Sequence, residues 1–306
     1  MTVDETNENS TLPQLAVLVN TCDKFEDCWG PFFVLWKKYG GKAINHTLYL
    51  NTERKTFDSP TDVAVRSLRV CETNGWTAPR PPTWSWCLEK ALDAITEDFV
   101  LYLQEDYFLD RPADEDRIAR ILRWMSDNPG AGCVRLDCAA KSSPAPDGSF
   151  RPIDPKWWYF VSCQAAIWRK DVLHGLLREH EDAWQFERWG SKRARLAGCR
   201  FFALEPENGR WPLHYVKTGV IQGKWFDPVV SLFRENDIEV DFSRRGFYAG
   251  KYGKKESGWF RWQWNRARYN AMAFAARFIW PPRSLFEVLS PRRRKLVRVS
   301  LFHENV

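Results

Sequence analysis

Short, mainly apolar runs alternate along the chain with longer segments whose apolar residues recur every three or four positions. The runs 15–19, 99–103 and 201–204 are uninterrupted, whereas 44–50, 133–136 and 159–168 each contain polar residues. Runs of this length between polar residues predict strands that are buried on both faces of a parallel sheet.

Segments 25–39, 84–95, 114–127 and 169–178 have the apolar spacing of amphipathic helices. Thr83 or Ser85 can cap the second of them. Helices alternating with buried strands predict an α/β fold, with a mostly parallel central sheet flanked by helices.

The apolar run 99–103 ends abruptly in Gln104-Glu105-Asp106. Ligands of open α/β sheets bind at the carboxyl ends of the strands, so this acidic pair is expected at the binding edge. Carboxylates next to a diphosphate are the usual ligands of Mg²⁺ or Mn²⁺. The alternative is that Glu105 and Asp106 only cap or solvate a turn.

Four stretches in this order, 20–24, 84–110, 161–170 and 181–187, resemble those of nucleotide-sugar glycosyltransferases with the GT-A (Rossmann-like) fold. The specific likeness is to bacterial enzymes of surface-polysaccharide (lipopolysaccharide and capsule) synthesis, and it covers roughly residues 14–226. The resemblance implies a nucleotide-diphosphate sugar donor, most simply a UDP-sugar, and Mn²⁺ or Mg²⁺. The acceptor would be a sugar hydroxyl of a glycan or a lipid-linked glycan.

The family's strand-end motif is usually Asp-x-Asp, whereas this chain has Gln104-Glu105-Asp106. The resemblance therefore assigns the metal to Asp106 first and to Glu105 second. Thr21 and Asp23 follow the first strand, where such folds contact the nucleotide, although both could simply cap the next helix.

The late loop of the resemblance supplies His214 to the metal, and Lys217 and Lys224 to the diphosphate. Basic groups there can neutralise charge that develops on the leaving diphosphate. A structural role for His214 is the alternative.

Inverting transfer needs one carboxylate to deprotonate the acceptor hydroxyl. The resemblance assigns this role to the segment 182–187, with Glu187 as first choice and Asp182 as second. Trp184 and Phe186 flank Glu187, and apolar surroundings raise the pKa of a carboxyl group. A surface acid paired with Arg188 or Arg193 is the alternative.

The sequence Trp157-Trp158-Tyr159 is a candidate acceptor-sugar platform, with core packing as the alternative. The chain's 17 tryptophans favour a surface that handles carbohydrate or nucleotide.

Composition is that of a soluble globular protein, with 44% hydrophobic and 27% charged residues. An acidic, polar start and the lack of an apolar run of about 18 residues give no sign of a signal peptide or membrane span. Eight cysteines without a CxxC pair indicate reduced thiols and argue against zinc. We therefore expect a cytoplasmic protein.

Charge is distributed unevenly. Residues 243–306 hold 15 Lys and Arg against three acids, while the whole chain has a net charge of +6. We expect a disordered leader (1–13), a catalytic domain (14–240) and a basic helical region (241–306). The Trp and Arg residues of the basic helical region suit binding to the anionic inner face of the cytoplasmic membrane. A solvated helical hairpin is the alternative, and no recognition motif supports nucleic-acid binding.

Two other functions stay open. The imperfect acidic motif would suit a non-catalytic binding or scaffold protein at the membrane. A nucleotidyltransferase also has strand-end carboxylates, but it normally has a glycine-rich phosphate loop after the first strand, and residues 20–25 contain no glycine.

Overall fold

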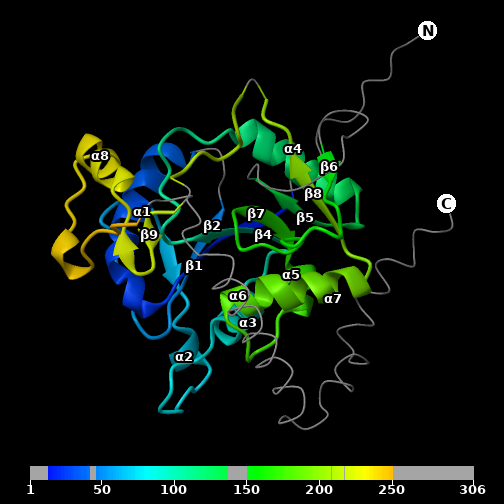
Figure 1. The fold of residues 1–306 in the computed structure, drawn as a ribbon, viewed down its shortest axis with the longest axis horizontal. Coiled ribbons are helices and arrows are strands. Elements are labelled where there is room, and N and C mark those ends of the chain that lie inside the picture. Colours follow the sequence, from blue (N-terminus) through cyan, green and yellow to red (C-terminus); the bar gives the residue numbers. More distant parts are fainter. Residues whose placement is uncertain (1–12, 42–45, 137–149, 208, 217, 251–306) are drawn as a thin grey trace, which may run out of the picture.

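A computed structural model describes residues 13–41, 46–136, 150–207, 209–216 and 218–250. An eight-stranded sheet in the order β3-β2-β1-β4-β7-β5-β8-β6 runs through its centre (Figure 1). The strands are β1 (Leu15–Asn20), β2 (Thr47–Asn51), β3 (Val65–Ser67), β4 (Phe99–Gln104), β5 (Ala131–Arg135), β6 (Phe150–Pro152), β7 (Ala166–Arg169) and β8 (Arg200–Leu204).

Most neighbouring strands are parallel. Parallel pairs join β3, β2, β1 and β4, and also β5 and β8. Strand β7 is antiparallel to both β4 and β5, and β6 is antiparallel to β8. This mixed α/β architecture agrees with the GT-A, Rossmann-like fold expected from the sequence.

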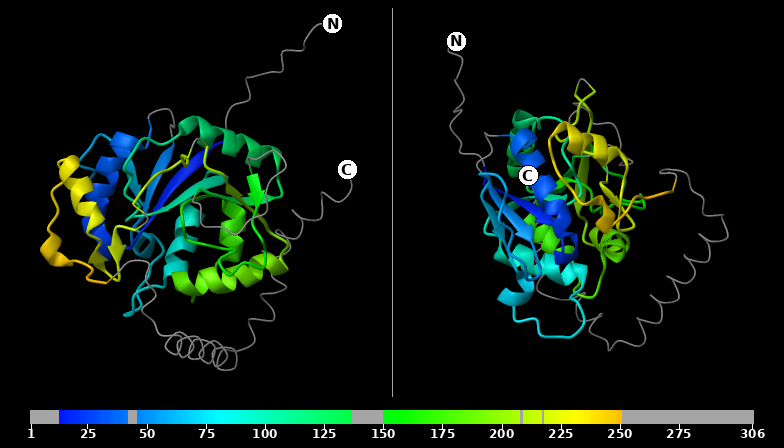
Figure 2. Two further views of the ribbon diagram at one scale, coloured as in Figure 1. Left: turned by 45° about the horizontal axis from the view of Figure 1, so that its top comes forward. Right: turned by 90° about the vertical axis from the view of Figure 1, so that its left-hand side faces the viewer.

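Each face of the sheet has its own core, because successive side chains of a strand point to opposite faces. Leu15, Val17 and Val19 pack toward α1 (Glu26–Tyr39), α4 (Glu115–Asp127) and α8 (Pro228–Glu235). Ala16 and Leu18 pack toward α2 (Val70–Thr73), α3 (Trp84–Ala94) and α5 (Lys170–Leu176). The sheet is therefore the middle of three layers (Figure 2).

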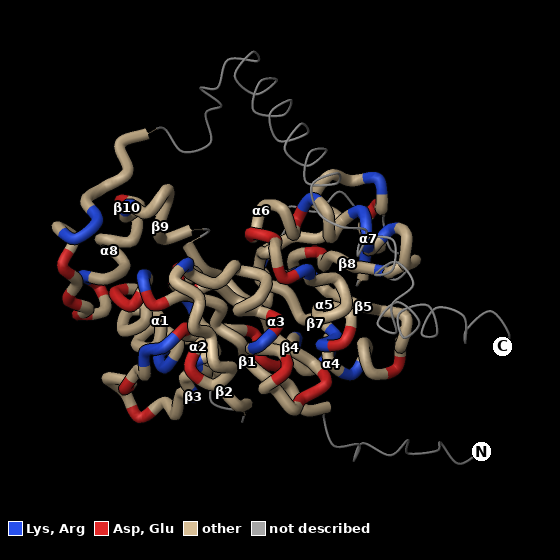
Figure 3. Tube along the Cα trace, turned by 90° about the horizontal axis from the view of Figure 1, so that it is seen from below, with Lys and Arg blue, Asp and Glu red and all other residues tan. Residues whose placement is uncertain are grey.

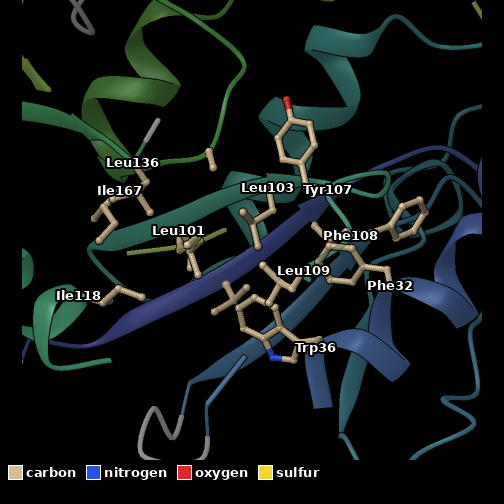
Figure 4. Packing of buried hydrophobic residues seen from close by; sticks show 14 of the residues in the cluster. Phe32, Trp36, Leu101, Leu103, Tyr107, Phe108, Leu109, Ile118, Leu136 and Ile167 are labelled. Carbon is tan, nitrogen blue, oxygen red and sulfur yellow. The ribbon is translucent and has the colours of Figure 1, made fainter. Parts of the chain in front are cut away.

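The first core is densely aromatic. Phe32 and Trp36 of α1 approach Leu101 and Leu103 of β4, with Phe108 beside them (Figure 4). This packing fixes the carboxyl end of β4, where the acidic pair follows.

Three of the four predicted helices form with ends close to those expected, while the fourth is shorter, because α5 ends at Leu176. Thr83 caps α3 by accepting a hydrogen bond from the Trp86 N–H at 3.2 Å. The Asp114 carboxylate caps α4 in the same way, accepting from the Arg117 N–H at 3.0 Å.

The predicted strand 159–168 is wrong in its first half, because only Ala166–Arg169 joins the sheet as β7. Backbone donors of the first half bond to side chains instead. The Val161 N–H donates to Ser191 Oγ at 2.8 Å, and the Cys163 N–H donates to Glu187 Oε1 at 2.8 Å. This half follows the helical segment 183–196 rather than a neighbouring strand.

Several short elements are not among those predicted from the sequence. They are β6, β9 (Val220–Ile221), β10 (Lys224–Trp225), α6 (Ala183–Gln185), a π-helical turn (Phe186–Gly190), α7 (Ser191–Leu196) and α8. The last three helical pieces before β8 are continuous and place residues 183–190 beside the end of the sheet.

A late strap, defined as residues 213–216 and 218–220, runs antiparallel to residues 106–110. Leu109 and Tyr215 form an antiparallel bridge, and the Val216 N–H donates to the Phe108 carbonyl at 3.0 Å. The strap thereby brings a segment from late in the chain to the carboxyl end of β4.

Within the described ranges, no helix combines the length and the apolar character needed to cross a bilayer.

Candidate active site

The strand order reverses between β1 and β4, since β2 lies on one side of β1 and β4 on the other. In open α/β sheets the crevice at such a switch point is the usual ligand site. Two buried amides connect the strand ends there. Asn51 Nδ2 donates to Asn20 Oδ1 at 2.7 Å, and Asn20 Nδ2 donates to the Tyr102 hydroxyl at 3.2 Å.

A cavity of about 1000 Å³ opens at this switch point and extends past β7 to the end of β5. Its polar side includes residues at the ends of β1 and β4, and its other side is largely aromatic. The lining comprises Asn20, Thr21, Cys22, Phe25, Trp84, Gln104, Glu105, Tyr107, Arg135, Leu136, Trp157, Tyr159, Ser162, Cys163, Gln164, Ala183, Trp184, Glu187, Trp211, Leu213, His214 and Tyr215.

Glu105 is the member of the acidic pair that lines this cavity. Burial, and then the neighbouring Asp106 carboxylate, raise the pKa of Glu105 above its usual range. A hydrogen bond with Thr21 and the charge of Arg245 act in the opposite direction. A carboxylate in this environment would be stabilised by a cation bound beside it.

Asp106 has a different environment, because it is only 7% exposed and does not belong to the cavity lining. Its Oδ2 accepts hydrogen bonds from the Thr218 hydroxyl at 2.7 Å and from the N–H groups of Gly219 and Val220, both at 3.1 Å. Burial raises the pKa of Asp106, and these three hydrogen bonds oppose that rise. Asp106 therefore anchors the late strap to the end of β4.

His214 lies on the strap and lines the cavity. Its Nδ1 is 2.5 Å from Asp110 Oδ1, a hydrogen bond that fixes the orientation of the ring. In metal sites a histidine commonly bonds a carboxylate through one ring nitrogen while the other nitrogen binds the ion. Nε2 of His214 is thus the nitrogen that can reach a ligand.

The three predicted metal ligands do not form a compact cluster. In the described part of the chain, ligand atoms of three His, Cys, Asp or Glu residues come within 4.8 Å of one another at Glu89, Asp93 and His174, between α3 and α5. They do not do so at Glu105, Asp106 and His214. Mg²⁺ is usually held by one or two protein carboxylates together with substrate phosphates and water, so the Glu105 carboxylate suits such an open site.

Glu187 lies on the π-helical turn and lines the cavity. Its Oε1 accepts from the Cys163 N–H at 2.8 Å and from the Ser162 hydroxyl at 3.2 Å. Burial raises the pKa of Glu187, and these two hydrogen bonds oppose that rise. Arg193, a candidate partner in the sequence, instead forms a bidentate pair with Glu181.

The Ser191 hydroxyl holds the π-helical turn through two hydrogen bonds. It donates to the Glu187 carbonyl at 2.5 Å, and it accepts from the Val161 N–H. Ser191 is fully buried. The segment 161–163 and the π-helical turn are therefore joined at both the backbone and the side chain of Glu187. Single-turn π-bulges occur frequently at functional sites.

Of the other predicted site residues, Thr21 lines the cavity, whereas Asp182, Asp23 and Lys224 do not. Asp182 is exposed and caps α6, where it forms a capping box with Gln185. The Asp23 carboxylate accepts from the N–H groups of residues 53–55, which joins the loop after β1 to the loop after β2. Thr21 lines the cavity and accepts from Trp29 Nε1 at 3.0 Å. Lys224 is exposed outside the lining, and Lys217 lies outside the described residues.

The sequence did not single out Arg135, which ends β5 and lines the cavity while only 3% exposed. Arg135 is a charged residue within the otherwise apolar run 133–136, and such an interruption of a buried strand is the signal that could have found it. Trp157 and Tyr159, named as a candidate platform, do line the cavity, whereas Trp158 between them does not.

The fold and the site together define a mixed α/β protein of GT-A type with an acidic cavity at its switch point. No family model matches the chain, and no curated protein matches it. A mannosyltransferase from Pyrobaculum calidifontis, solved with GDP-Man and Mn²⁺, is similar over 96% of this chain and 85% of that one, with 16% identity and a TM-score of 0.45.

S. aureus TarS 1–349 is similar over 76% of this chain and 68% of that one, with 12% identity and a TM-score of 0.40. The CMP:2-keto-3-deoxy-manno-octonic acid synthetase complexed with CTP is similar over 73% of this chain and 97% of that one, with 13% identity and a TM-score of 0.40.

Proposed function

We propose that the protein is a metal-assisted glycosyltransferase that moves a sugar from a nucleotide-diphosphate sugar, most simply a UDP-sugar, to a sugar hydroxyl. One observation carries this proposal. A single cavity contains Glu105 at the switch-point edge and Glu187 on the π-helical turn, and burial raises the pKa of both. The first carboxylate suits a cation beside a diphosphate, and the second suits a general base.

The donor would lie with its nucleotide at the ends of β1 and β2, near Thr21 and Asp23. Glu105 and His214 Nε2 would hold Mn²⁺ or Mg²⁺, with donor oxygens completing the coordination. When bound, this ion neutralises the negative charge of the leaving diphosphate. Lys217 and Lys224 would add positive charge from the segment around the strap.

Asp106 has a modified role in this proposal. The sequence placed it first on the metal, but its Oδ2 already accepts three hydrogen bonds from the strap. We therefore place Glu105 first. Asp106 would hold the strap, and through it His214, at the donor site.

Glu187 would act as the base. Its Oε1 is held by Ser162 and Cys163, so Oε2 is the oxygen left to accept the acceptor's hydroxyl proton. A raised pKa brings the carboxylate closer to the strength needed for proton transfer near neutral pH. Asp182 remains the second choice, although its carboxylate caps α6.

The acceptor would be a growing bacterial surface glycan, presented at the inner face of the cytoplasmic membrane. Residues 243–306 would contact the anionic lipids, since their net charge of +12 favours such a surface. The start of this basic region packs on α1, where Arg244 pairs with Glu26 at 2.9 Å. Figure 3 shows acidic and basic positions side by side around α1 and α8.

Calorimetric titration with UDP and Mn²⁺ tests the donor site. We expect metal-dependent binding that Glu105→Ala abolishes. Binding that needs no metal, or that survives in this variant unchanged, would exclude the metal role. For the base, Glu187→Gln should lose transfer by about 100-fold or more while donor binding stays intact. Full activity in Glu187→Gln would move the base to another residue.

The two other functions give different results in the same assays. A scaffold protein would bind nucleotide sugars without turnover on any acceptor. A nucleotidyltransferase would release diphosphate from a nucleoside triphosphate and a sugar phosphate. Measuring both products separates the three.

A further inference from the structure

Three aromatic side chains of the cavity lie around the proposed base. Trp184 is 74% exposed and Tyr159 is 40% exposed, and both line the cavity with Trp157 and Glu187. Trp168, by contrast, is fully buried in the core. Large rings left open to solvent inside a cavity are unfavourable unless a ligand covers them.

These rings are held in place before any ligand binds. The Arg135 guanidinium lies 5.3 Å from the centre of the Trp157 ring. Arg195 Nη2 also donates to the Trp157 carbonyl at 3.1 Å, and the Tyr159 ring packs edge-on against Trp157 at 6.0 Å. A fixed set of rings loses little conformational entropy on binding.

The backbone that carries Trp184 is fixed by a capping box between Asp182 and Gln185, which starts the short helix α6. Glu187 follows Trp184 by three residues on the continuing helical turn, a spacing that places side chains on one face. The ring and the carboxylate therefore border the same part of the cavity.

We propose that Trp157, Tyr159 and Trp184 form an acceptor platform that binds a pyranose ring of a saccharide. A pyranose has a face of C–H groups and an edge of hydroxyls. The C–H face suits the negative face of an aromatic ring, and the hydroxyls suit nearby polar groups such as Gln164 and Arg135.

The size and position of the cavity favour a saccharide over a lipid bilayer or a protein surface. Pockets for a small ligand occupy roughly 300–1000 Å³, so a cavity of about 1000 Å³ suits a ligand of this size class. All three platform rings belong to the lining of this cavity. The acceptor identity rests on the proposed role of Glu187, whereas the saccharide binding itself does not.

Trp158 provides a matched control. It is 51% exposed and adjacent to two platform residues, but it lies outside the cavity lining, 5.6 Å below the Arg188 guanidinium. A bilayer or a protein partner would use Trp158 together with Trp184. A saccharide in the cavity would use Trp184 alone.

The experiment measures binding to an array of bacterial oligosaccharides, followed by titration calorimetry with the array members that bind. We expect Trp184→Ala to weaken saccharide binding roughly tenfold, Trp184→Phe to keep most of it, and Trp158→Ala to leave it unchanged. UDP binding should be the same in all three variants, because none of these rings lies at the switch-point edge.

The proposal is overturned if the wild-type protein binds no oligosaccharide, or if Trp184→Ala binds as well as wild type. It is also overturned if phosphatidylglycerol-containing vesicles bind and both Trp158→Ala and Trp184→Ala weaken that binding equally. If the wild-type protein binds saccharide but not UDP, the proposed glycosyltransferase function is contradicted, while the saccharide platform is supported.

Discussion

Adjacent side chains at the end of β4 differ in what surrounds them, and this difference sets their roles. Glu105 faces the cavity, whereas Asp106 faces three donors of the late strap. The sequence predicts an acidic pair at this edge, because the apolar run stops there. It cannot tell which acid faces the ligand, because the partners of Asp106 lie more than 100 residues later.

Substitutions of the two acids should change the stability of the protein in opposite directions. Asp106→Ala leaves three donors of residues 218–220 without their acceptor, so we expect a loss of about 3 kcal/mol in the free energy of unfolding. Glu105→Gln removes a carboxylate whose charge is disfavoured by burial and by the neighbouring Asp106, the two causes that raise its pKa, so stability at pH 7 should rise. Chemical denaturation of both variants measures this. Equal losses in the two would contradict the assignment.

A second prediction concerns the pH dependence of Glu187. Hydrogen bonds from Ser162 and Cys163 favour the charged carboxylate and so hold down a pKa that burial raises. Ser162→Ala removes one of them, so the pKa of Glu187 should rise further. Because the base must be ionised, the acidic limb of the rate profile should move to higher pH. Ser162→Thr keeps the hydroxyl and should restore the wild-type profile.

Carbon-labelled glutamate in a magnetic-resonance titration gives the same pKa without relying on turnover. A purely structural role of Ser162 would lower the melting temperature without moving that titration.

At the scale of elements, the apolar periodicity predicted the longer strands and helices well. The strands β1 and β4 and the helices α1, α3 and α4 form close to their predicted positions. The two strands bury alternate side chains in both cores, and each of these helices buries one apolar face in one core. The strand predicted over residues 159–165 did not form, although the segment is mainly apolar. Its N–H groups bond to Ser191 and Glu187, which are contacts that no local pattern reveals.

The late strap gives an element-scale prediction at Gly219. A Cβ on this residue would overlap the ring of Phe108, which packs edge-on against Phe233 at 4.9 Å and cannot withdraw. We expect Gly219→Ala to cost about 1–3 kcal/mol of stability and to weaken donor binding as the strap moves. Thermal unfolding and UDP titration measure the two effects.

Gly30 serves as the control for this substitution, because no atom beyond its chain neighbours and the backbone of α1 lies within 4 Å of an added Cβ. Alanine favours a helix over glycine by about 0.5–1 kcal/mol, but the following Pro31 disfavours helical backbone at a residue that carries a Cβ. The two effects oppose each other, so we expect Gly30→Ala to change stability little and UDP binding not at all. If Gly219→Ala is equally harmless, the strap is not held against Phe108 as described.

At the scale of the whole molecule, the predicted boundary at residue 240 can be tested. Arg245 forms a bidentate pair with Asp27, in which the side chains are 6% and 10% exposed, and it lies over the Phe25 ring at 4.4 Å. Breaking a buried pair by removing one partner is strongly destabilising. A chain ending at residue 240 should therefore unfold at a lower temperature than one ending at residue 250.

Arg245→Ala in the full chain should lower the free energy of unfolding by about 3 kcal/mol. This loss should account for most of the difference in stability between the two truncated chains. Equal melting temperatures for the chains ending at 240 and 250 would instead support the boundary drawn from the sequence. Differential scanning calorimetry measures all three proteins.

The overall topology followed from the order of strands and helices, because parallel strands joined by helices leave few arrangements. The antiparallel β7 and the switch point depend on how strands far apart in the chain pair, which composition does not encode. Once that order is known, the cavity's position at the ends of β1 and β4 follows.

The strap also makes the binding site a late product of synthesis. Asp106 leaves the ribosome about 110 residues before Thr218, its hydrogen-bond donor. At translation speeds of about 5–20 residues per second, this interval lasts on the order of ten seconds. During that time the sheet edge exists without His214 or the 218–220 turn. A growing chain can therefore complete the lining of this cavity only after most of its sequence has emerged.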